Sequence, residues 1–473
     1  MRGAPASLRD EGPAPPPAKA LGPIAMLALS FGCIVGSGWV VVLGDWLRAC
    51  GPWGVVLGML AGFTVMLANS GAYAELISRF PVAGGEFIFA QRLFGDRIAF
   101  FVGWLYTLSL LAVAAFEATA LPWVLETLFP AIKGPLLYTA LGFPVTLGSL
   151  TIGLGGTLLV ALLNYRGTHA AAALQTVLSG VFLVLAVVLV TLGFALGSTD
   201  HWKPPLLGEG GKPWWLGALW VFATAPMFLN GFQSVAQTVE ARARSVTFPR
   251  IAASMAAALA VSAAFYCLIT LAAASAQPWQ SLLDRPMATA AAFEALLPHQ
   301  ALSILVLVTA ALSVARVWNG VSIWAARLLL AQARAGFLPP KFAAVDARGG
   351  NPTFAVGFVA LCTAGGVLLG RGAIIPLVDM ASLCLAGNLV LACLAALRAR
   401  RSREPQAYRT PGGMVTLRYA LAGSAVMAGF ALLDPLLRRP GRVPVEWLVT
   451  GAWIAMGAVF RVLHPGPGGR GRP

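Results

Sequence analysis

The sequence predicts an all-α membrane protein of about 12 transmembrane helices, arranged as a five-plus-five inverted repeat followed by two extra C-terminal helices. Composition is the first reason: 58% of the 473 residues are hydrophobic and 11% are charged, and the mean hydropathy is +0.79. A soluble domain does not need that much apolar surface. The second reason is the number of apolar stretches that are long enough to cross a bilayer. These stretches are centred near residues 35, 65, 112, 153, 183, 225, 263, 316, 361, 385, 425 and 454.

The first span is interrupted by a glycine-rich segment, Gly-Cys-Ile-Val-Gly-Ser-Gly at residues 32–38, between helical stretches at 21–31 and 39–47. Backbone at membrane depth departs from a helix only where it is buried in protein or lines a wet cavity. Amides freed at the start of a half-helix, at the positive end of its dipole, suit a carboxylate. The interruption therefore predicts a binding site.

A second interruption lies in the sixth span, at residues 225–232. Pro226 removes a backbone donor there, and Gly231 relaxes the backbone. If spans one to five repeat as spans six to ten, the two interruptions occupy matching positions, and the odd number of spans inverts the second half. Paired interrupted helices in corresponding positions indicate a solute site near the bilayer midplane.

The basic residues indicate which side each loop faces. Most of the 33 Lys and Arg residues fall in loops on the same side as the N-terminus when the spans are threaded alternately. By the positive-inside rule, both termini are then cytoplasmic, in a multi-pass protein of the cell membrane. The net charge of +15 therefore reflects the topology in the membrane, and no nucleic-acid partner is expected. Arg438, Arg439 and Arg442 fall on the outer side and fit the rule poorly.

One membrane domain is expected at 21–463, between a disordered cytoplasmic tail at 1–20 and a flexible cytoplasmic tail at 464–473. Its inverted repeats cover about 21–197 and 214–397, and its extra helices about 416–463. The six cysteines and four histidines are scattered, which argues against a disulfide framework, a metal site and a metal enzyme. No cofactor is expected.

Several motifs, in the same order along the chain, resemble those of the amino acid–polyamine–organocation permeases, and the resemblance covers roughly residues 20 to 463. Asn164 and Gly167, between the fourth and fifth spans, fit the family as well. The motifs are the interruption at 32–38, Arg-Phe-Pro-Val-Ala-Gly-Gly-Glu-Phe at 79–87, the stretch from Gly231 to Glu240, and the end of the eighth span from Ala326 to Pro339.

The resemblance implies a secondary active transporter and no enzyme. Its substrate would be an amino acid, moved by alternating access with proton symport or exchange. The α-carboxylate would bind the amides of the first interruption, the α-amine would bind freed carbonyls of both, and an aromatic ring of the sixth span would close over the substrate. The implied site residues are Val35, Gly36, Ser37, Gly38, Phe228, Gly231 and Phe232.

The chain also departs from the family pattern. Only Glu240 is acidic at the end of the sixth span, and Gln233 stands where relatives have Glu or Asp. Residues 170–195 hold no Lys or Arg, so the fifth-span lysine of some proton-coupled members is missing.

Two charged residues inside spans are the candidates for coupling or ion pairing. Glu117 lies about 20 Å beyond Trp104 by helical rise, in the outer half of the third span, and an ionisable group at such depth is by default a functional hypothesis. It is a counter-charge for a cationic substrate, a proton site, or a structural partner of a buried base. Arg316, in the eighth span, stays charged. It is either a tethered cation that takes the place of sodium, or one partner of a structural ion pair with Glu117 or Asp379.

Other functions stay open from the sequence alone. Glu117 favours a carboxylate-free cationic amine, such as a polyamine or ethanolamine, as the runner-up substrate. A channel would need a continuous lined pore, which an inverted repeat within one chain disfavours. A membrane-embedded sensor would bind the solute without moving it.

Overall fold

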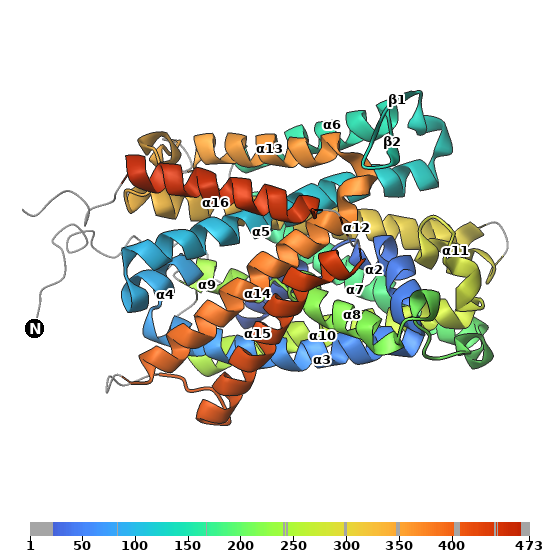
Figure 1. The fold of residues 1–473 in the computed structure, drawn as a ribbon, viewed down its shortest axis with the longest axis horizontal. Helices are drawn as coiled ribbons and strands as arrows, with labels where there is room; N and C mark the ends of the chain where they lie inside the picture. Colours follow the sequence, from blue (N-terminus) through green and yellow to red (C-terminus); the bar gives the residue numbers. More distant parts are fainter. Residues whose placement is uncertain are drawn as a thin grey trace, which may run out of the picture.

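The structure is a computed structural model of the chain. The structure describes residues 22–464 apart from 83, 167, 240–241, 243–244, 298–299, 347–350, 402–406, 439–440 and 442. The expected tail at 1–20, nearly all of the tail at 464–473, Gly167 and Glu240 lie outside the described residues. Figure 1 shows a helical bundle with two ends, named here the α4 end after α4 (Gly85–Phe94) and the hairpin end after β1 (Leu136–Ala140) and β2 (Phe143–Thr146).

The first half of the chain contains the predicted interruption. The break covers 33–37, between α1 (Pro23–Gly32) and α2 (Gly38–Val41). α3 (Leu43–Arg79) joins the end of the first span to the second span through a bend at Gly51, whose φ of 69° is a left-handed value that favours glycine. The remaining helices of this half are α4, α5 (Asp96–Leu128), α6 (Leu147–Arg166) and α7 (Thr168–Leu196).

The second half begins with the other interrupted helix. α8 (Trp214–Phe228) ends at the break, and α9 (Ser234–Thr238) follows it. The helices that come next are α10 (Phe248–Ala276), α11 (Ala288–Glu294), α12 (Ala301–Arg334), α13 (Thr353–Leu368) and α14 (Ile374–Ala399), followed by the C-terminal pair α15 (Gly413–Arg438) and α16 (Val445–Leu463).

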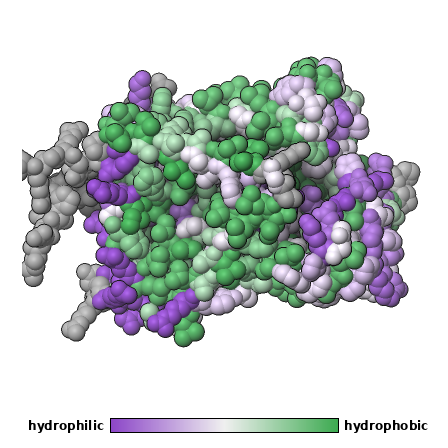
Figure 2. Space-filling view, in the orientation of Figure 1, coloured by the Kyte–Doolittle hydropathy of each residue, from purple (hydrophilic) through white to green (hydrophobic). Residues whose placement is uncertain are grey.

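Most of the long helices are apolar enough for a bilayer. Among the described residues, nine helices are long and apolar enough to cross a bilayer, and α8 and α13 are shorter apolar helices. Figure 2 shows hydrophobic side chains across the middle of the face in view, with hydrophilic side chains gathered at both ends. With the broken first span added, these elements confirm the predicted all-α membrane fold of about 12 helices.

The helices pack in two groups, and the site forms between them. α3 contacts α8 and α10, and α1 contacts α10, so the two interrupted spans belong to one group. α5, α6, α12 and α13 contact one another and form the other group. α7 bridges the groups through α1, α10 and α12, and α14 packs on α3, α5 and α8.

The short β-hairpin between α5 and α6 was not expected from the sequence. Its strands are antiparallel and are joined by Leu141 and Gly142, with φ of 48° and 82°. Two successive positive φ values are typical of the tight turns that match the twist of a hairpin. The Tyr138 hydroxyl donates to the Leu368 carbonyl at 2.6 Å, which fixes the hairpin to the end of α13.

Two polar connections attach the C-terminal helices to the core. The rings of Trp104 on α5 and Trp453 on α16 stack with centroids 4.3 Å apart, and each indole N–H donates to the other residue's carbonyl, at 2.8 and 2.9 Å. At the α4 end, Arg400 makes a bidentate contact with the fully buried carboxylate of Glu75, at 2.6 and 2.7 Å. Thr410 also donates to Glu75, through its backbone N–H at 3.2 Å and its hydroxyl at 2.9 Å.

Candidate functional site

The first break leaves backbone polar groups without helical partners in the centre of the bundle. The last turn of α1 closes with short-range bonds, since Cys33 N–H donates to Ser30 and Ile34 N–H donates to Phe31. The helix resumes where the amides of Val40 and Val41 donate to the carbonyl of Ser37. The carbonyl of Val35 and the amide of Ser37 fall between these turns, and each is bound by a charged side chain from another helix.

The second break lies directly against the first. Gly231 has a φ of 147°, and a Cβ placed on it would lie 2.5 Å from Ile34 Cγ1 and 2.8 Å from the carbonyl carbon of Cys33. A Cβ on Gly38 would lie 2.3 Å from Cε1 of Phe228. Glycine at both positions therefore lets the two interrupted spans come into contact.

Glu117 extends from α5 to the first break. Its Oε2 accepts a hydrogen bond from the Ser37 hydroxyl at 2.8 Å, and its two oxygens share the Ser37 backbone N–H at 3.2 and 3.3 Å. The side chain is 2% exposed. The structure places this side chain at the first break, and residue 117 lies in the half of α5 nearer the hairpin end. A Cβ on Gly36 would lie 1.9 Å from Oε1, so glycine at 36 makes room for this carboxylate.

Arg316 extends from α12 to the other side of the same break. Its Nη2 donates to the Val35 carbonyl at 2.8 Å. The guanidinium carbon lies 5.2 Å from the ring centre of Phe31 on α1 and 4.5 Å from that of Phe182 on α7, within the range of cation–π attraction. The side chain is buried, and Nε and Nη1 have no hydrogen-bond partner among the described residues.

Asp379 belongs to a different cluster. Its carboxylate accepts from Arg438 at 2.6 Å and from the indole of Trp220 at 3.3 Å, and so it does not serve as the partner of Arg316. Arg438 also pairs with Asp434 one helical turn earlier. Arg438 therefore has two acidic partners, Asp379 on α14 and Asp434 on α15. They compensate the charge of a residue that fits the positive-inside rule poorly.

A small closed cavity lies where the two breaks meet. Its volume is about 10 Å³, enough for roughly one water molecule, so the site is closed in this conformation. Of the two candidate lid rings, Phe228 lines the cavity, while Phe232 packs against Tyr73 with ring centres 5.4 Å apart. The lining residues are Cys33, Ile34, Gly36, Gly38, Val113, Phe116, Glu117, Met227, Phe228, Asn230, Tyr266, Val317 and Val321.

Among the lining residues that the sequence did not single out are Phe116, Asn230 and Tyr266. Asn230 and Tyr266 carry a detectable signal, since each is a buried polar side chain within an apolar span. Tyr266 is the one tyrosine of α10. Phe116 carries no such signal, because a phenylalanine in an apolar span usually packs against neighbouring helices.

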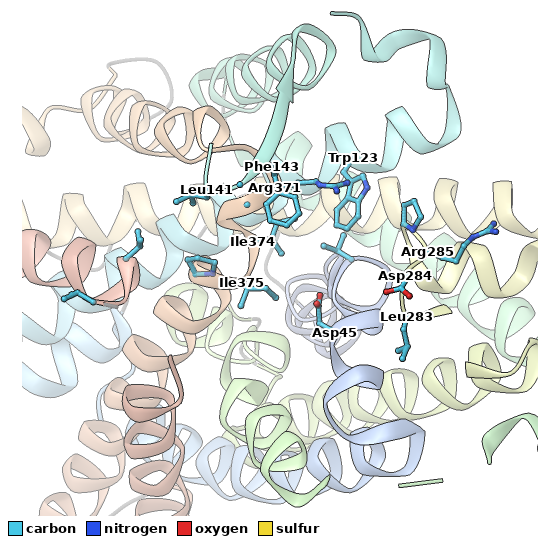
Figure 3. A pocket seen from close by; sticks show the side chains of 17 residues that line it. Asp45, Trp123, Leu141, Phe143, Leu283, Asp284, Arg285, Arg371, Ile374 and Ile375 are labelled. Carbon is cyan, nitrogen blue, oxygen red and sulfur yellow. The ribbon is translucent and has the colours of Figure 1, made fainter. Parts of the chain in front are cut away.

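A larger cleft opens at the hairpin end of the same region, as Figure 3 shows. Its volume is about 800 Å³, and its walls carry charges of both signs, from Asp45 and Asp284 and from Arg285 and Arg371. Arg371 lies over the rings of Trp123 and Phe143, at 5.1 and 5.0 Å.

The cleft and the small cavity have no lining residue in common. Asp45 of the cleft lies about two helical turns beyond Gly38 of the cavity, which is about 10 Å of helix. Phe228, which lines the cavity, meets the ring of Trp46 edge to face, with centroids 4.8 Å apart.

Comparison with known proteins identifies the family. The sequence profile described as amino acid permease matches residues 21–459. The chain is 25% identical to the methylthioribose transporter of Bacillus subtilis, over 94% of this chain and 93% of the relative. It is also 25% identical to a branched-chain amino acid permease of Lactococcus lactis subsp. cremoris, over 91% of both chains. A cationic amino acid transporter of Arabidopsis thaliana, described as chloroplastic, is 31% identical over 46% of this chain and 39% of the relative. The chain therefore belongs to the amino acid permease family of the amino acid–polyamine–organocation superfamily, and it is a multi-pass membrane transporter and not an enzyme.

Proposed function

We propose that the protein is a secondary active transporter that moves an amino acid or a closely related amine across the cell membrane by alternating access. The observation that carries this proposal is the contact between the two interrupted spans around a closed, buried cavity. Interrupted helices at matching positions of two halves are typical of a solute site near the bilayer midplane. The cleft at the hairpin end supplies one route of entry.

The binding surface comes from both breaks. Gly36 and Gly38 line the cavity from the first break, and Phe228 lines it from the second. Val35 and Ser37 instead hold Arg316 and Glu117, and Gly231 packs against the first break. Phe228 must rotate or move with the end of α8, because its ring fills the space beside Gly38. Phe232 supports the second break from behind through its contact with Tyr73.

We also infer that Arg316 acts as a tethered cation in the step that opens and closes the site. Its guanidinium joins α12 to α1 through the Val35 carbonyl and lies against α7 through the ring of Phe182. A permanently charged group in this position makes a sodium ion unnecessary there. Coupling is then by proton symport or by exchange of one solute for another.

The orientation follows from the distribution of basic residues. Lys and Arg are enriched in the loops on the side of the N-terminus, and we infer that the α4 end faces the cytoplasm, together with both termini. The hairpin end and its cleft then face outward.

Uptake into proteoliposomes tests the proposed function. We expect saturable uptake of a radiolabelled solute from a panel of amino acids and amines, and accelerated uptake when the same solute is preloaded inside. Non-saturable flux without counterflow would indicate a channel. Binding without any flux would indicate a sensor.

The role of Arg316 needs its own variants. Arg316→Gln should lower the rate of uptake at least tenfold, because the link between α12 and the first break is lost. Arg461→Gln is the matched control, since Arg461 also lies over a phenylalanine ring, that of Phe337 at 5.0 Å, but on α16. Equal loss in both variants would show that the effect is not specific to the break.

A further inference from the structure

The polar side chains that line the small cavity are Cys33, Glu117, Asn230 and Tyr266, and two of them offer acceptor oxygens to a solute. Glu117 is the one charged side chain among the described residues that line it. Asn230 also lines it and is 4% exposed, and its Oδ1 has no hydrogen-bond partner among the described residues. A buried amide oxygen without a partner is costly, so the site favours a ligand that donates a hydrogen bond to it.

The position that a solute's carboxylate could occupy is already taken by the chain. The Ser37 amide and hydroxyl, the donors exposed by the first break, both bind Glu117. Oε2 accepts two of these bonds, from the hydroxyl and the shared amide, while Oε1 accepts only the shared amide. A carboxylate has about four lone-pair positions, so Oε1 keeps capacity for one further donor.

The rest of the lining suits a cation. The rings of Phe116 and Phe228 lie edge to face with centroids 6.5 Å apart, and Tyr266 lies 6.0 Å from Phe228. Aromatic faces attract cations, and the attraction is strongest where water is excluded. No lysine or arginine is among the lining residues that the structure describes. Arg316 lies on the far side of the break, at Val35, and is not one of them.

We infer that the transported solute carries no carboxylate and binds as an organic amine, with its ammonium group donating to Glu117 and Asn230. Glu117 is then the resident carboxylate of the site. This inference rests on the proposed transport function and narrows its substrate class from amino acids and amines to amines. The Ser37 donors hold Glu117 in place, and the aromatic rings contact the apolar part of the amine.

An amino acid would meet two obstacles in the same cavity. Its carboxylate would bring two further acceptors next to the carboxylate of Glu117 and the unpaired Oδ1 of Asn230. It would also lie beside the carboxylate of Glu117 where water is excluded, and like charges repel strongly in such surroundings. To reach the Ser37 donors, it would first have to displace Glu117.

Binding measurements on matched pairs test the inference without any variant. The purified protein in detergent is titrated at pH 7 with phenylalanine and phenethylamine, leucine and isopentylamine, and lysine and cadaverine. The members of each pair differ only by the carboxylate. We expect at least one amine to bind with a dissociation constant at least ten times lower than that of its parent amino acid.

Two variants assign the preference to Glu117. Glu117→Gln keeps the size of the side chain and removes its charge, so the affinity for the amine should fall at least tenfold. Glu126→Gln is the matched control on the same helix, because Glu126 binds Thr146 at 2.7 Å outside the cavity, and it should keep the affinity of the wild type.

The outcomes separate this inference from the proposed function. Wild-type protein that binds amino acids as tightly as their amines, or more tightly, would overturn the inference while leaving transport intact. Amine binding without flux in proteoliposomes would contradict transport and leave the recognition of amines standing. If Glu117→Gln does not fold, the comparison of pairs on the wild type decides alone.

Discussion

Substituting alanine for Gly231 tests whether the two interrupted spans touch. A methyl group at this position would lie 2.5 Å from Ile34 Cγ1 and 2.8 Å from the carbonyl carbon of Cys33 and the amide nitrogen of Ile34. The latter two atoms are backbone, so they cannot move aside as the end of a flexible side chain would. The φ of 147° is also a value that residues with a side chain rarely adopt.

The magnitude follows from these two effects. Holding a non-glycine residue in a sparsely populated backbone region costs about 1–3 kcal/mol. Forcing an extra methyl group into a packed interior costs about 1–3 kcal/mol. We therefore expect Gly231→Ala to lower the free energy of unfolding by about 2–6 kcal/mol and to reduce uptake.

The assay is thermal unfolding of the purified protein in detergent, with Gly429→Ala as the matched control. Gly429 lies in α15, and a Cβ placed there meets no atom within 4 Å. The control should match the wild type or exceed it slightly, because alanine favours a helix more than glycine does. If Gly231→Ala is as stable as the control, the contact between the breaks does not exist in the protein, and the site described here is wrong.

Three further predictions concern coupling, the α4 end and the lid. Uptake by the wild type should be unchanged when sodium is replaced by potassium on both sides of the membrane, and a sodium requirement would rule out Arg316 as the tethered cation. Arg400→Gln should lower the free energy of unfolding by about 3–5 kcal/mol because it leaves the buried Glu75 carboxylate without its cation, and adding Glu75→Gln should recover most of the loss in a double-mutant cycle. Phe228→Leu should raise the KM for uptake about tenfold, while Phe232→Leu should leave KM within twofold, since only Phe228 lines the cavity; equal effects on KM would contradict this division of roles.

Much of the fold could be predicted from local sequence signals. Glycines at 32, 36 and 38 interrupt an apolar span, and the structure has its break at 33–37. Such signals work because a span in hydrocarbon has few ways to satisfy its backbone, and any departure from a helix is conspicuous. The hairpin was missed because it lies outside the spans, where that constraint is absent.

The arrangement of the site could be predicted only in part. A buried Glu117 and a buried Arg316 were recognisable from charge alone, but their partners were not. In the structure, Glu117 and Arg316 both bind backbone groups of the first break, on opposite sides of Gly36. Among the described residues, no salt bridge joins these two side chains. Which face of a helix meets which neighbour depends on packing between distant segments, and hydrophobic periodicity in nearly uniform apolar spans does not record it.

The guanidinium at the first break has a consequence for the energy supply of transport. An ion that is bound and released carries its electrochemical gradient into each cycle, and a group fixed to the chain returns with the empty carrier every time. If Arg316 is the tethered cation proposed above, the membrane's sodium gradient has no means of entry at the first break, and the reset of the empty protein does not wait for an ion to leave. Any accumulation of solute would then draw on the proton gradient, on a second solute moving the other way or, for a cationic amine, on the membrane potential.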